Sequence, residues 1–445
     1  MSDSSAYPQT LDYLYERLPM FSRIGAAALK PDLTNTLKLC SALGNPHEKF
    51  KSVHIVGTNG KGSTSHALAA VFQYAGYKTG LYTSPHLVDF RERILVNGIP
   101  VSKDWVVDFV NANKALIEEV NPSFFEITVA MAFAYFAEQK VDIAIIETGL
   151  GGRLDSTNVI TPLLSIITNI SYDHKDLLGN TLAEIATEKA GIIKPGVPFV
   201  VGEQNDETER IFFEHSVHKK APLYYAQSLW GMVRIRQDSK YQYYKAVNNA
   251  RREMYDLQTD MLGNYQHHNL KTVLTAVEIL SHQGLKVTIP GAISALTDVK
   301  KTTGLRGRWD WLQENPTVIC DVAHNPAGLN EVLQQWEQIP ATAKHIVIGF
   351  VKDKDISDAL ALFPKDATYY FCNANIERAL PAEDLRKTAT QYSLSGDSYP
   401  TVTAAVLTAK NSMTNTDALL ITGSFFIVGE AIELFKTAKE TSETI

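Results

Sequence analysis

The most constraining feature of this chain is a short β-branched segment that runs directly into a glycine-rich loop. Residues 53–56 read Val-His-Ile-Val, and residues 57–64 read Gly-Thr-Asn-Gly-Lys-Gly-Ser-Thr. Glycines permit a close approach of the backbone, so successive N–H groups can point at phosphate oxygens while Lys61 adds a positive charge. A helix that begins near Ser63 would add the positive end of its dipole. The pattern favours a phosphate-binding loop over a glycine turn without a ligand.

The loop departs from the standard phosphate-loop pattern at two positions. Gly62 separates Lys61 from the two hydroxyl residues, and Ile55 stands where the first glycine is expected. A variant loop is indicated, and with it a particular family.

The composition is that of a folded cytoplasmic protein rather than of a nucleic-acid-binding or membrane protein. The 445 residues are enough for two or three domains, and the formal net charge is −7. No dense run of Lys or Arg suggests nucleic acid, and no apolar run is long enough to span a membrane. The polar start of the chain lacks the pattern of a leader peptide. Cys40, Cys320 and Cys372 form no CxxC pair, which indicates a reducing compartment.

Short apolar segments alternate with helical patterns, which predicts an α/β fold with a mostly parallel sheet covered on both faces. Strands are expected first at residues 53–56, 79–83, 143–147, 164–168 and 199–201. A second set is expected at 318–320, 345–349, 368–371 and 418–422, with helices over 329–338 and 382–391. We therefore expect a second, smaller α/β domain. The boundary is expected in the polar stretch 298–307, which divides the chain into residues 1–298 and 299–445.

Polar and glycine-rich motifs follow several of the expected strands. These motifs are Thr83-Ser84-Pro85-His86, Glu147-Thr148-Gly149-Leu150-Gly151-Gly152-Arg153 and Asn169-Ile170-Ser171-Tyr172-Asp173-His174. Ligands of open α/β sheets bind outside the carboxyl ends of the strands, so the motifs can converge on one crevice. The Ser84 hydroxyl and the Glu147 carboxylate suit magnesium. Glu147 or His174 alone could equally be a hydrogen-bonded structural group, but their convergence favours a site.

Taken in order, the motifs resemble those of the folylpolyglutamate synthase/dihydrofolate synthase family, which belongs to the Mur ligase superfamily. The resemblance covers nearly the whole chain, as far as Gly423-Ser424-Phe425-Phe426. It rests on Gly57-Thr58-Asn59-Gly60-Lys61-Gly62-Ser63, Thr83-Ser84-Pro85-His86-Leu87 with Glu92-Arg93-Ile94, Glu147-Thr148-Gly149-Leu150-Gly151-Gly152, Asp173-His174, Glu188-Lys189-Ala190-Gly191-Ile192 and Asp321-Val322-Ala323-His324-Asn325-Pro326.

The resemblance implies a P-loop-containing, Mur-ligase-like ATPase domain that also binds folate in residues 1–298, and a glutamate-ligase domain in 299–445. Members of the family join the carboxyl group of dihydropteroate, or of a folate, to the amine of L-glutamate. ATP drives this reaction through an acyl phosphate. Phosphoryl transfer needs positioning and charge stabilisation rather than a nucleophilic side chain, which agrees with Lys61 and magnesium. A folylpolyglutamate synthase without the dihydrofolate synthase activity is the alternative.

The family match also implies roles for individual residues. Lys61, Lys189, His174 and Arg308 are the expected catalytic residues, and Ser84, Glu147 and His174 are expected to hold two magnesium ions. The residues expected at ATP are Gly57, Thr58, Asn59, Gly60, Lys61, Gly62, Ser63, Thr64, Asn269, Arg308, Asp321 and His324. Those expected at the folate or glutamate substrate are His86, Phe90, Arg93, Phe125, Glu126, Thr128 and Arg153. The last three ATP residues follow the boundary, so the ATP site should span the cleft between the domains.

Two of these assignments have a plainer alternative in the residues themselves. In the family, the lysine that matches Lys189 is carbamylated, whereas the residues alone allow an ion pair with Glu184 or Glu188. Phe124 and Phe125 open an apolar helix that is expected to run to about residue 137, and they could pack in the core rather than line a pterin pocket. The resemblance favours the functional interpretation in both cases.

Two other classes of protein are weaker matches. A nucleotide-driven switch or kinase gives no reason for Glu147, His174 and Lys189 to occur together. A cell-wall amino-acid ligase of the same superfamily would use a UDP-muramoyl substrate and carry an extra domain before the phosphate loop. The expected partners are therefore small molecules, with no nucleic acid and no membrane, and the protein is expected to be a cytoplasmic monomer.

Overall fold

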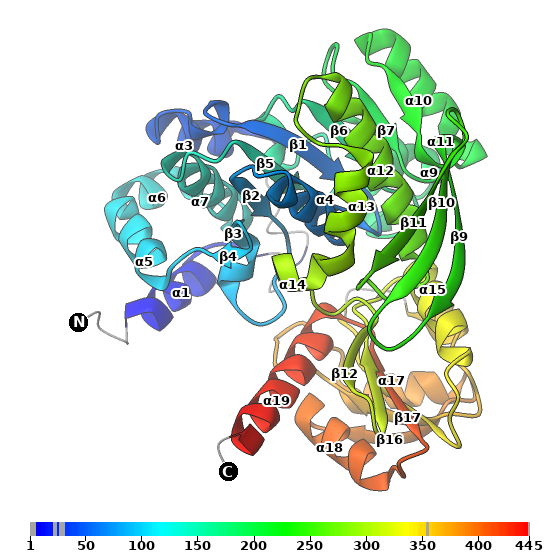
Figure 1. The fold of residues 1–445 in the computed structure, drawn as a ribbon. Helices are drawn as coiled ribbons and strands as arrows, with labels where there is room; N and C mark the ends of the chain where they lie inside the picture. Colours follow the sequence, from blue (N-terminus) through cyan, green and yellow to red (C-terminus); the bar gives the residue numbers. More distant parts are fainter. Residues whose placement is uncertain (1–5, 21–24, 26–31, 353–355, 444–445) are drawn as a thin grey trace.

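The structure, a computed structural model, describes residues 6–20, 25, 32–352 and 356–443; residues 1–5 of the polar N-terminal stretch lie outside this part. The described chain forms two α/β domains, each on its own sheet (Figure 1). Cys40, Cys320 and Cys372 are buried and unpaired, as predicted. No helix in the described ranges is long and apolar enough to cross a membrane.

The first domain is built on an eight-stranded sheet with the order β4-β3-β2-β5-β1-β6-β7-β8. The strands from β2 to β8 in this order run parallel, and β3 and β4 add an antiparallel edge. All five predicted strands are present. The bounds are β1 (Lys51–Val56), β2 (Thr79–Tyr82), β3 (Ile94–Val96), β4 (Ile99–Pro100), β5 (Ile143–Glu147), β6 (Leu164–Ile167), β7 (Phe199–Val201) and β8 (Leu223–Tyr225).

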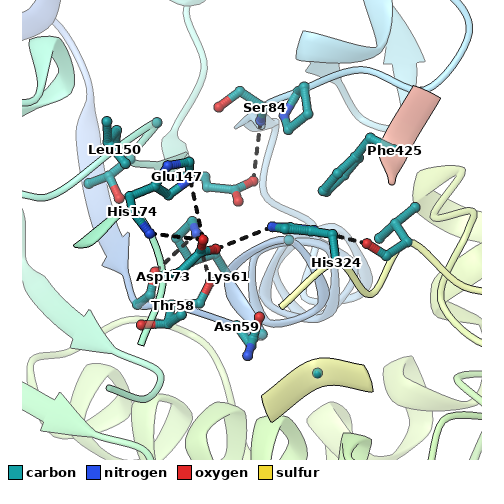
Figure 2. Close-up of a pocket in the computed structure, with 18 of the residues that line it drawn as sticks. Thr58, Asn59, Lys61, Ser84, Glu147, Leu150, Asp173, His174, His324 and Phe425 are labelled. Carbon is teal, nitrogen blue, oxygen red and sulfur yellow. Dashed lines mark hydrogen bonds and ion pairs between the residues drawn. The ribbon is translucent and has the colours of Figure 1, made fainter. Parts of the chain in front are cut away.

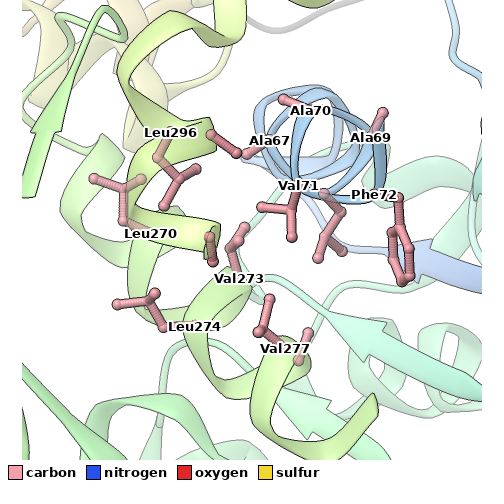
Figure 3. Close-up of a cluster of buried hydrophobic side chains, with 14 of the residues drawn as sticks. Ala67, Ala69, Ala70, Val71, Phe72, Leu270, Val273, Leu274, Val277 and Leu296 are labelled. Carbon is pink, nitrogen blue, oxygen red and sulfur yellow. The ribbon is translucent and has the colours of Figure 1, made fainter. Parts of the chain in front are cut away.

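Helices cover both faces of this sheet because successive side chains of a strand point to opposite sides. On one face, Ile143 and Ile145 of β5 belong to a buried cluster with α4, α12 and α13, part of which Figure 3 shows. On the other face, Ala144 and Ile146 pack with α7. The helices of this domain are α1 (Ala6–Arg17), α3 (Thr34–Ala42), α4 (Lys61–Tyr74), α5 (Lys103–Ala112), α6 (Lys114–Val120), α7 (Phe124–Glu138), α8 (Lys175–Leu178), α9 (Leu182–Ala190), α10 (Asp206–Lys219), α11 (Ala226–Leu229), α12 (Gln266–His282), α13 (Ile289–Ala295) and α14 (Val299–Thr303).

A three-stranded antiparallel sheet in the first domain was not predicted. It consists of β9 (Trp230–Gln237), β10 (Gln242–Asn248) and β11 (Glu253–Thr259). The buried face of β10 carries Gln242 and Asn248 besides Tyr244 and Ala246, so its sequence shows no regular apolar alternation. Gln242 is satisfied there by donating to the carbonyl oxygens of Met261 and Gly263 at 2.8 and 2.9 Å. The buried polar side chains of the sheet are thus stabilised by tertiary hydrogen bonds that a pattern of apolar residues does not reveal.

The second domain is built on a six-stranded sheet with the order β12-β13-β17-β14-β15-β16, parallel except for β12. All four predicted strands are present, and the two predicted helices correspond to α15 and α17. Helices α15, α16 and α17 pack on one face, and α18 and α19 on the other. The bounds are β12 (Asp310–Gln313), β13 (Thr317–Cys320), α15 (Pro326–Glu337), β14 (Lys344–Ile348), α16 (Ser357–Leu360), β15 (Thr368–Cys372), α17 (Ala382–Thr390), β16 (Ser395–Tyr399), α18 (Val402–Ser412), β17 (Ala418–Thr422) and α19 (Phe425–Glu443).

The chain passes between the domains just after α14. Val299 and Leu305 belong to the buried cluster of the first domain, and the second sheet begins at Asp310. Lys300 of α14 donates to Asp310 across this connection at 2.6 Å. The packing thus changes from one domain to the other over residues 306–309. The division at 298/299 stays a prediction about which parts fold independently.

A loop of the first domain also reaches the second domain. Leu87, in the loop after β2, packs against the cluster formed by α18 and α19. A Cβ atom at Gly429 of α19 would lie 2.2 Å from the carbonyl oxygen of Leu87. The carboxylate of Glu92 holds the loop by accepting hydrogen bonds from the backbone N–H groups of Leu87 at 2.7 Å and Asp89 at 2.8 Å. The domains therefore meet at a second contact besides the covalent connection.

We expect Gly429→Ala to destabilise the protein by about 1–3 kcal/mol, because the added methyl group collides with a backbone atom of the other domain. The measurement is thermal unfolding followed by circular dichroism. Glu433→Ala, at an exposed position one helical turn further along α19, is the control and should leave the midpoint near that of the unaltered protein. Equal midpoints for both variants would contradict the contact.

Candidate active site

A cavity of about 530 Å³ opens at the carboxyl ends of the parallel strands of the first sheet. Loops that follow β1, β2, β5 and β6 line it, and so do segments of the second domain that follow β13, β14 and β17. Figure 2 shows Ser84, Glu147, Asp173 and His324 gathered around Lys61. The motifs that follow separate strands therefore converge on one crevice, as the sequence predicted.

The loop between β1 and α4 has the geometry of a phosphate-binding loop. Gly60 has a φ of 83°, in the left-handed region that favours glycine, and α4 begins directly after it at Lys61. The predicted start near Ser63 was two residues too late, because the turn at Gly60 already aligns the backbone for the helix. Lys61 Nζ donates to the carbonyl oxygens of Gly57 and Thr58 at 3.0 and 3.2 Å. The lysine thus folds back over its own loop.

Neighbouring strands hold the loop in place. The N–H of Asn59 donates to Asn169 Oδ1 at 2.8 Å, and the Thr168 hydroxyl donates to the carbonyl oxygen of Asn59 at 2.5 Å. The Thr58 hydroxyl donates to the carbonyl oxygen of Ser171 at 3.0 Å. Residues after β6 therefore fix the loop from one side, so its backbone amides are oriented before any ligand binds.

Helix α12 supports the loop from the other side. Gln266 donates to the Ser63 hydroxyl at 3.2 Å, and the Thr64 hydroxyl donates to Asn269 Oδ1 at 3.4 Å. Thr64 is fully buried. Residues 57–63 and Asn269 line the cavity, whereas Thr64 is not among its lining residues. Of the predicted ATP residues on the first domain, Thr64 thus lies behind the loop and supports it.

The Glu147 carboxylate is buried at the end of β5, with 4% of the residue exposed. It accepts a hydrogen bond from the N–H of Ser84 at 3.3 Å. Burial raises the pKa of Glu147 to about 7, and the charges of Lys61 and Arg308 oppose that rise. His174 lines the same cavity. Within the described ranges no three His, Cys, Asp or Glu side chains are arranged to hold a metal ion, so an ion here would also need Ser84 and ligands from outside the protein.

Lys189, near the end of α9, is buried with 4% exposed. Its Nζ donates to the carbonyl oxygen of Gly57 at 3.1 Å, the same oxygen that accepts from Lys61. Burial, and then the charge of Lys61, lowers the pKa of Lys189 to about 7. A large fraction of this amine is therefore neutral, and nucleophilic, near pH 7.

The two acids that could pair with Lys189 have other partners. Glu188 forms an ion pair with Arg153 at 2.9 Å, and Glu184 accepts hydrogen bonds from the N–H groups of Asn180 and Thr181. In the part of the chain that the structure describes, Lys189 has no ion pair with either acid. The ion-pair alternative is thus absent from this arrangement.

The glycine-rich loop after β5 packs on the end of α9. A Cβ atom at Gly152 would lie 2.8 Å from the carbonyl oxygen of Lys189, so only glycine fits there. The Asp155 carboxylate turns the loop by accepting hydrogen bonds from the N–H groups of Gly149 and Leu150 at 2.8 and 2.9 Å. Asp155 also lines the cavity. These contacts position Lys189 beside the phosphate loop.

Side chains of the two domains meet across the cavity. Asp173 Oδ2 lies 3.2 Å from His324 Nε2 and accepts from Asn325 Nδ2 at 3.2 Å. The side-chain amides of Asn325 and Asn59 exchange hydrogen bonds of 3.0 and 3.2 Å. The phosphate loop is therefore joined to the start of α15, and the cavity lies between the two domains. That the ATP site spans this cleft stays a prediction.

Arg308 and Asp321 of the second domain differ in their contacts. Arg308 lines the cavity with its guanidinium carbon 5.0 Å from the centre of the Phe425 ring. The buried Asp321 carboxylate accepts hydrogen bonds from the Tyr265 hydroxyl at 2.5 Å and from the N–H of Trp309 at 2.7 Å. Asp321 thus ties the residue before α12 to the start of the second domain, and both Asp321 and Arg308 line the cavity.

Three of the seven predicted substrate residues line the cavity, namely Arg93, Phe125 and Glu126. The Arg93 guanidinium stacks over Phe124 at 5.3 Å and donates to His86 Nδ1 at 2.8 Å. Burial lowers the pKa of His86 to about 3, so this histidine is a neutral acceptor that orients Arg93.

The other four predicted substrate residues are not among the residues that line the cavity, namely His86, Phe90, Thr128 and Arg153. Phe90 packs in the hydrophobic core of the first domain, and the Thr128 hydroxyl lies 3.1 Å from the Tyr82 hydroxyl. The Arg153 side chain is 55% exposed in its ion pair with Glu188. The first three thus lie behind the cavity wall, and Arg153 points to solvent.

Several residues in or beside the cavity were given no role from the sequence. Asn325 does not itself line the cavity but joins Asn59 and Asp173 beside it, and its position before Pro326 is typical of a helix N-cap. Glu203 follows the predicted strand 199–201, and the carboxyl end of a parallel strand was the available signal. Asp155 likewise lies in the loop that follows a parallel strand, β5. The order of residues along the chain does not show which of these side chains point into the cavity.

Two family models match the chain: the Mur ligase middle domain over residues 55–277, and the Mur ligase glutamate ligase domain over residues 307–425. The fold and the cavity thus define a Mur-type ligase with a phosphate loop in its first domain. The chain belongs to the dihydrofolate synthase/folylpolyglutamate synthase family of these ligases.

Relatives support this membership along the whole chain. The dihydrofolate synthase/folylpolyglutamate synthase of Bacillus subtilis is 33% identical over 442 residues, covering 96% of this chain and 98% of that protein. The structure of E. coli FolC with DHPP and ADP has a TM-score of 0.85 at 26% identity, with 98% and 99% of the two chains covered. The Yersinia pestis bifunctional enzyme, solved with AMPPNP and a Mn ion, has a TM-score of 0.81 at 26% identity, with 97% and 98% covered.

We expect Glu147→Gln to stabilise the metal-free protein by about 1–3 kcal/mol at pH 8. The carboxyl group binds its proton more tightly in the folded state, where its pKa is about 7, than in the unfolded state, where it is 4.5. Stability of the unaltered protein should therefore fall as the pH rises from 4.5 to 7, and the variant should lack that fall. Urea unfolding between pH 4.5 and 8 with a chelator tests this. A constant difference between the proteins across that range would contradict it.

Proposed function

We propose that the protein is an ATP-dependent ligase that adds L-glutamate to dihydropteroate, to the γ-carboxyl group of folates, or to both, with ADP and phosphate as products. One observation carries the proposal: the phosphate loop, the buried Glu147 and the side chains of Arg93, Phe124 and Phe125 line a single cavity. The Mur ligase domains and the family membership agree with this chemistry.

The reaction needs activation because a carboxylate is a poor electrophile at neutral pH. A substrate carboxylate oxygen attacks the γ-phosphorus of ATP, the bond to ADP breaks, and an acyl phosphate forms. The amine of L-glutamate then attacks the acyl carbon, phosphate leaves and the amine loses a proton. Both steps need oriented reactants and charge stabilisation, and a closed cleft that excludes water protects the acyl phosphate from hydrolysis.

Lys61 and Arg308 supply positive charge to the phosphoryl group in this scheme. Lys61 follows a loop whose backbone is already fixed by Asn169 and Thr168, so little reorganisation is needed when phosphates bind. Arg308 comes from the second domain and lies close to the loop: a Cβ atom at Gly62 would be 3.4 Å from its Nη2. We propose that domain closure brings this charge to the γ-phosphate.

Magnesium is proposed at Ser84 and Glu147, with His174 at a second ion. A hydroxyl and a carboxylate are the hard oxygen ligands that magnesium prefers, and a buried Glu147 with a raised pKa is stabilised as the anion by a nearby cation. When bound, the ions neutralise charge on the transferred phosphoryl group. The manganese in the Yersinia pestis relative supports the use of a divalent cation.

We also propose that Lys189 carries a carbamate. Its amine adds to the carbon of CO₂ and loses a proton, which needs the neutral amine that a pKa of about 7 provides. The product is an anion beside Lys61, where positive charge stabilises it. A carbamate at this position would turn a buried cation into a ligand for the second metal ion.

The remaining proposals concern the substrates, the partners and the oligomeric state. A folylpolyglutamate synthase without dihydrofolate synthase activity, or a ligase for another acid substrate, is the alternative. Small molecules are the proposed partners, and we propose a cytoplasmic monomer that binds neither nucleic acid nor membrane. The test is to incubate the purified protein with ATP, magnesium and L-glutamate, to offer dihydropteroate and tetrahydrofolate separately, and to identify products by mass. No glutamate adduct with either substrate would overturn the proposed function.

We expect Lys61→Ala to lower glutamate-dependent ADP formation by about a thousandfold, equivalent to ~4 kcal/mol of barrier, because a charge on the phosphoryl group is lost. A coupled ADP assay measures the rate. Lys38→Ala, at an exposed position on α3, is the control and should be as active as the unaltered protein. Near-normal turnover by Lys61→Ala would refute the role of the phosphate loop.

We expect the unaltered protein to show a carbamate signal by ¹³C NMR when it is equilibrated with ¹³C-bicarbonate, and Lys189→Ala to lack that signal. The variant should ligate at least a hundredfold more slowly, on the order of 3 kcal/mol of barrier, and excess acetate should restore part of the rate. Lys194→Ala is the matched lysine control, since Lys194 Nζ donates to the backbone carbonyl of Asn158 at 2.8 Å and Lys194 does not line the cavity. An unchanged spectrum in Lys189→Ala would assign the signal elsewhere.

A further inference from the structure

The cavity has an end that the proposed chemistry does not use. Ser84 and Glu147 lie on one side of the phosphate loop, and in Figure 2 Asn59 lies on the opposite side of Lys61 from Ser84. Beyond Asn59 the cavity is lined by Asn169, Glu203, His268, Ala327, Gly328 and Glu331. The reacting phosphate belongs beside Glu147, so the rest of the nucleotide must extend toward this end.

Of the two described acids that line this end, Glu203 and Glu331, Glu203 is tied to the phosphate loop. Its Oε1 accepts a hydrogen bond from Asn169 Nδ2 at 3.0 Å, and Asn169 Oδ1 accepts the N–H of Asn59 at 2.8 Å. The Glu203 side chain keeps 34% exposure, so a ligand in the cavity can reach it. One amide thus fixes the distance between the Glu203 carboxyl group and the loop that holds the phosphates.

The second oxygen of Glu203 has a neutral neighbour. Oε2 lies 3.9 Å from His268 Nδ1, and burial lowers the pKa of His268 to about 3, so this contact is not an ion pair. His268 Nδ1 is buried without a hydrogen-bond partner among the described residues. Burial also raises the pKa of Glu203 to about 7, and the charge of Lys271 opposes that rise. Among the described residues no hydrogen bond to Oε2 is formed, so the ionised carboxyl group can accept one there from a ligand.

The two common purine bases differ in what they present to such an acceptor. Adenine carries an exocyclic amine at position 6, which donates, whereas guanine carries a carbonyl oxygen there, which accepts. Two acceptors that face each other repel, and a site built for a hydrogen bond disfavours a ligand that cannot make it.

We propose that Glu203 accepts a hydrogen bond from the exocyclic amine of the nucleotide base and so selects adenine over guanine. This role rests on the proposed use of ATP and adds a specificity-determining residue to it. Asn169 is the positioning residue, because it holds Glu203 at a fixed place relative to the phosphate loop. A purely structural Glu203 would instead support Asn169 and the loop, and its loss would weaken all nucleotides alike.

The test is Glu203→Gln, which keeps an oxygen for Asn169 but places an amide NH₂ group at the other position. We measure ADP and GDP binding by calorimetry, and kcat/KM for ATP and GTP with saturating folate and L-glutamate. The preference for adenine over guanine nucleotides should fall at least about tenfold in both measurements. Glu209→Gln, an exposed position on α10, is the control and should keep the full preference.

A second measurement uses the unaltered protein and does not depend on the folding of a variant. We compare the binding of ADP, purine riboside diphosphate, which lacks the amine, and inosine diphosphate, which has the carbonyl oxygen. ADP should bind at least about tenfold more tightly than either, and inosine diphosphate should bind most weakly. Equal affinities, or an equal loss for all nucleotides in Glu203→Gln, would overturn the inference. Absence of any ligation by the unaltered protein with ATP would instead overturn the proposed function.

Discussion

Two lysine side chains donate to the same backbone carbonyl oxygen, that of Gly57, at 3.0 and 3.1 Å. One of them, Lys189, is buried, and the other follows the phosphate loop. Burial first, and then repulsion from the Lys61 ammonium group, lowers the pKa of Lys189, so Lys189 binds its proton weakly. The Glu147 carboxylate near them is also buried, and its pKa is raised. Three ionisable groups, Lys61, Glu147 and Lys189, thus lie close together in the cavity. The protonation of Glu147 and Lys189 depends on the charges around them, and the other contacts of the site hold these groups in place.

The second domain contributes side chains to the same cavity. Arg308 adds positive charge at the phosphate loop, and the Asn59–Asn325 amide pair and the Asp173–His324 contact join the two sides of the cleft. The loop after β2 carries Ser84 into the cavity and Leu87 onto α19, so one short segment contacts both the site and the other domain. A shift of the second domain would therefore be felt at the reacting groups. This coupling is a physical basis for the proposed closure of the domains on ATP.

Some residues named from the motif series have a supporting role in the structure. His86 orients Arg93, and Thr64 bonds to Asn269 behind the phosphate loop. Neither side chain lines the cavity, and each has a hydrogen-bond partner in the protein, which is the usual state of polar groups away from solvent. A residue within a functional motif therefore does not necessarily face the ligand. Its effect can reach the ligand through the side chain that it positions.

The amino-acid sequence alone determined the α/β class, the nine predicted strands and the place of the phosphate loop, because these depend on local apolar patterns and on glycines with fixed conformations. It also singled out Lys61, Glu147 and Lys189 as candidate site residues, since each lies in a motif after a strand or near the end of a helix, and all three line the cavity. Only the tertiary structure showed the small antiparallel sheet and which polar side chains reach the cavity. Buried Gln242 and Asn248 hide the small antiparallel sheet from any apolar pattern, and Glu203 joins the cavity only because β6 and β7 are neighbours. Which polar groups face a ligand is set by packing and desolvation among distant segments, and those act only once the chain has folded.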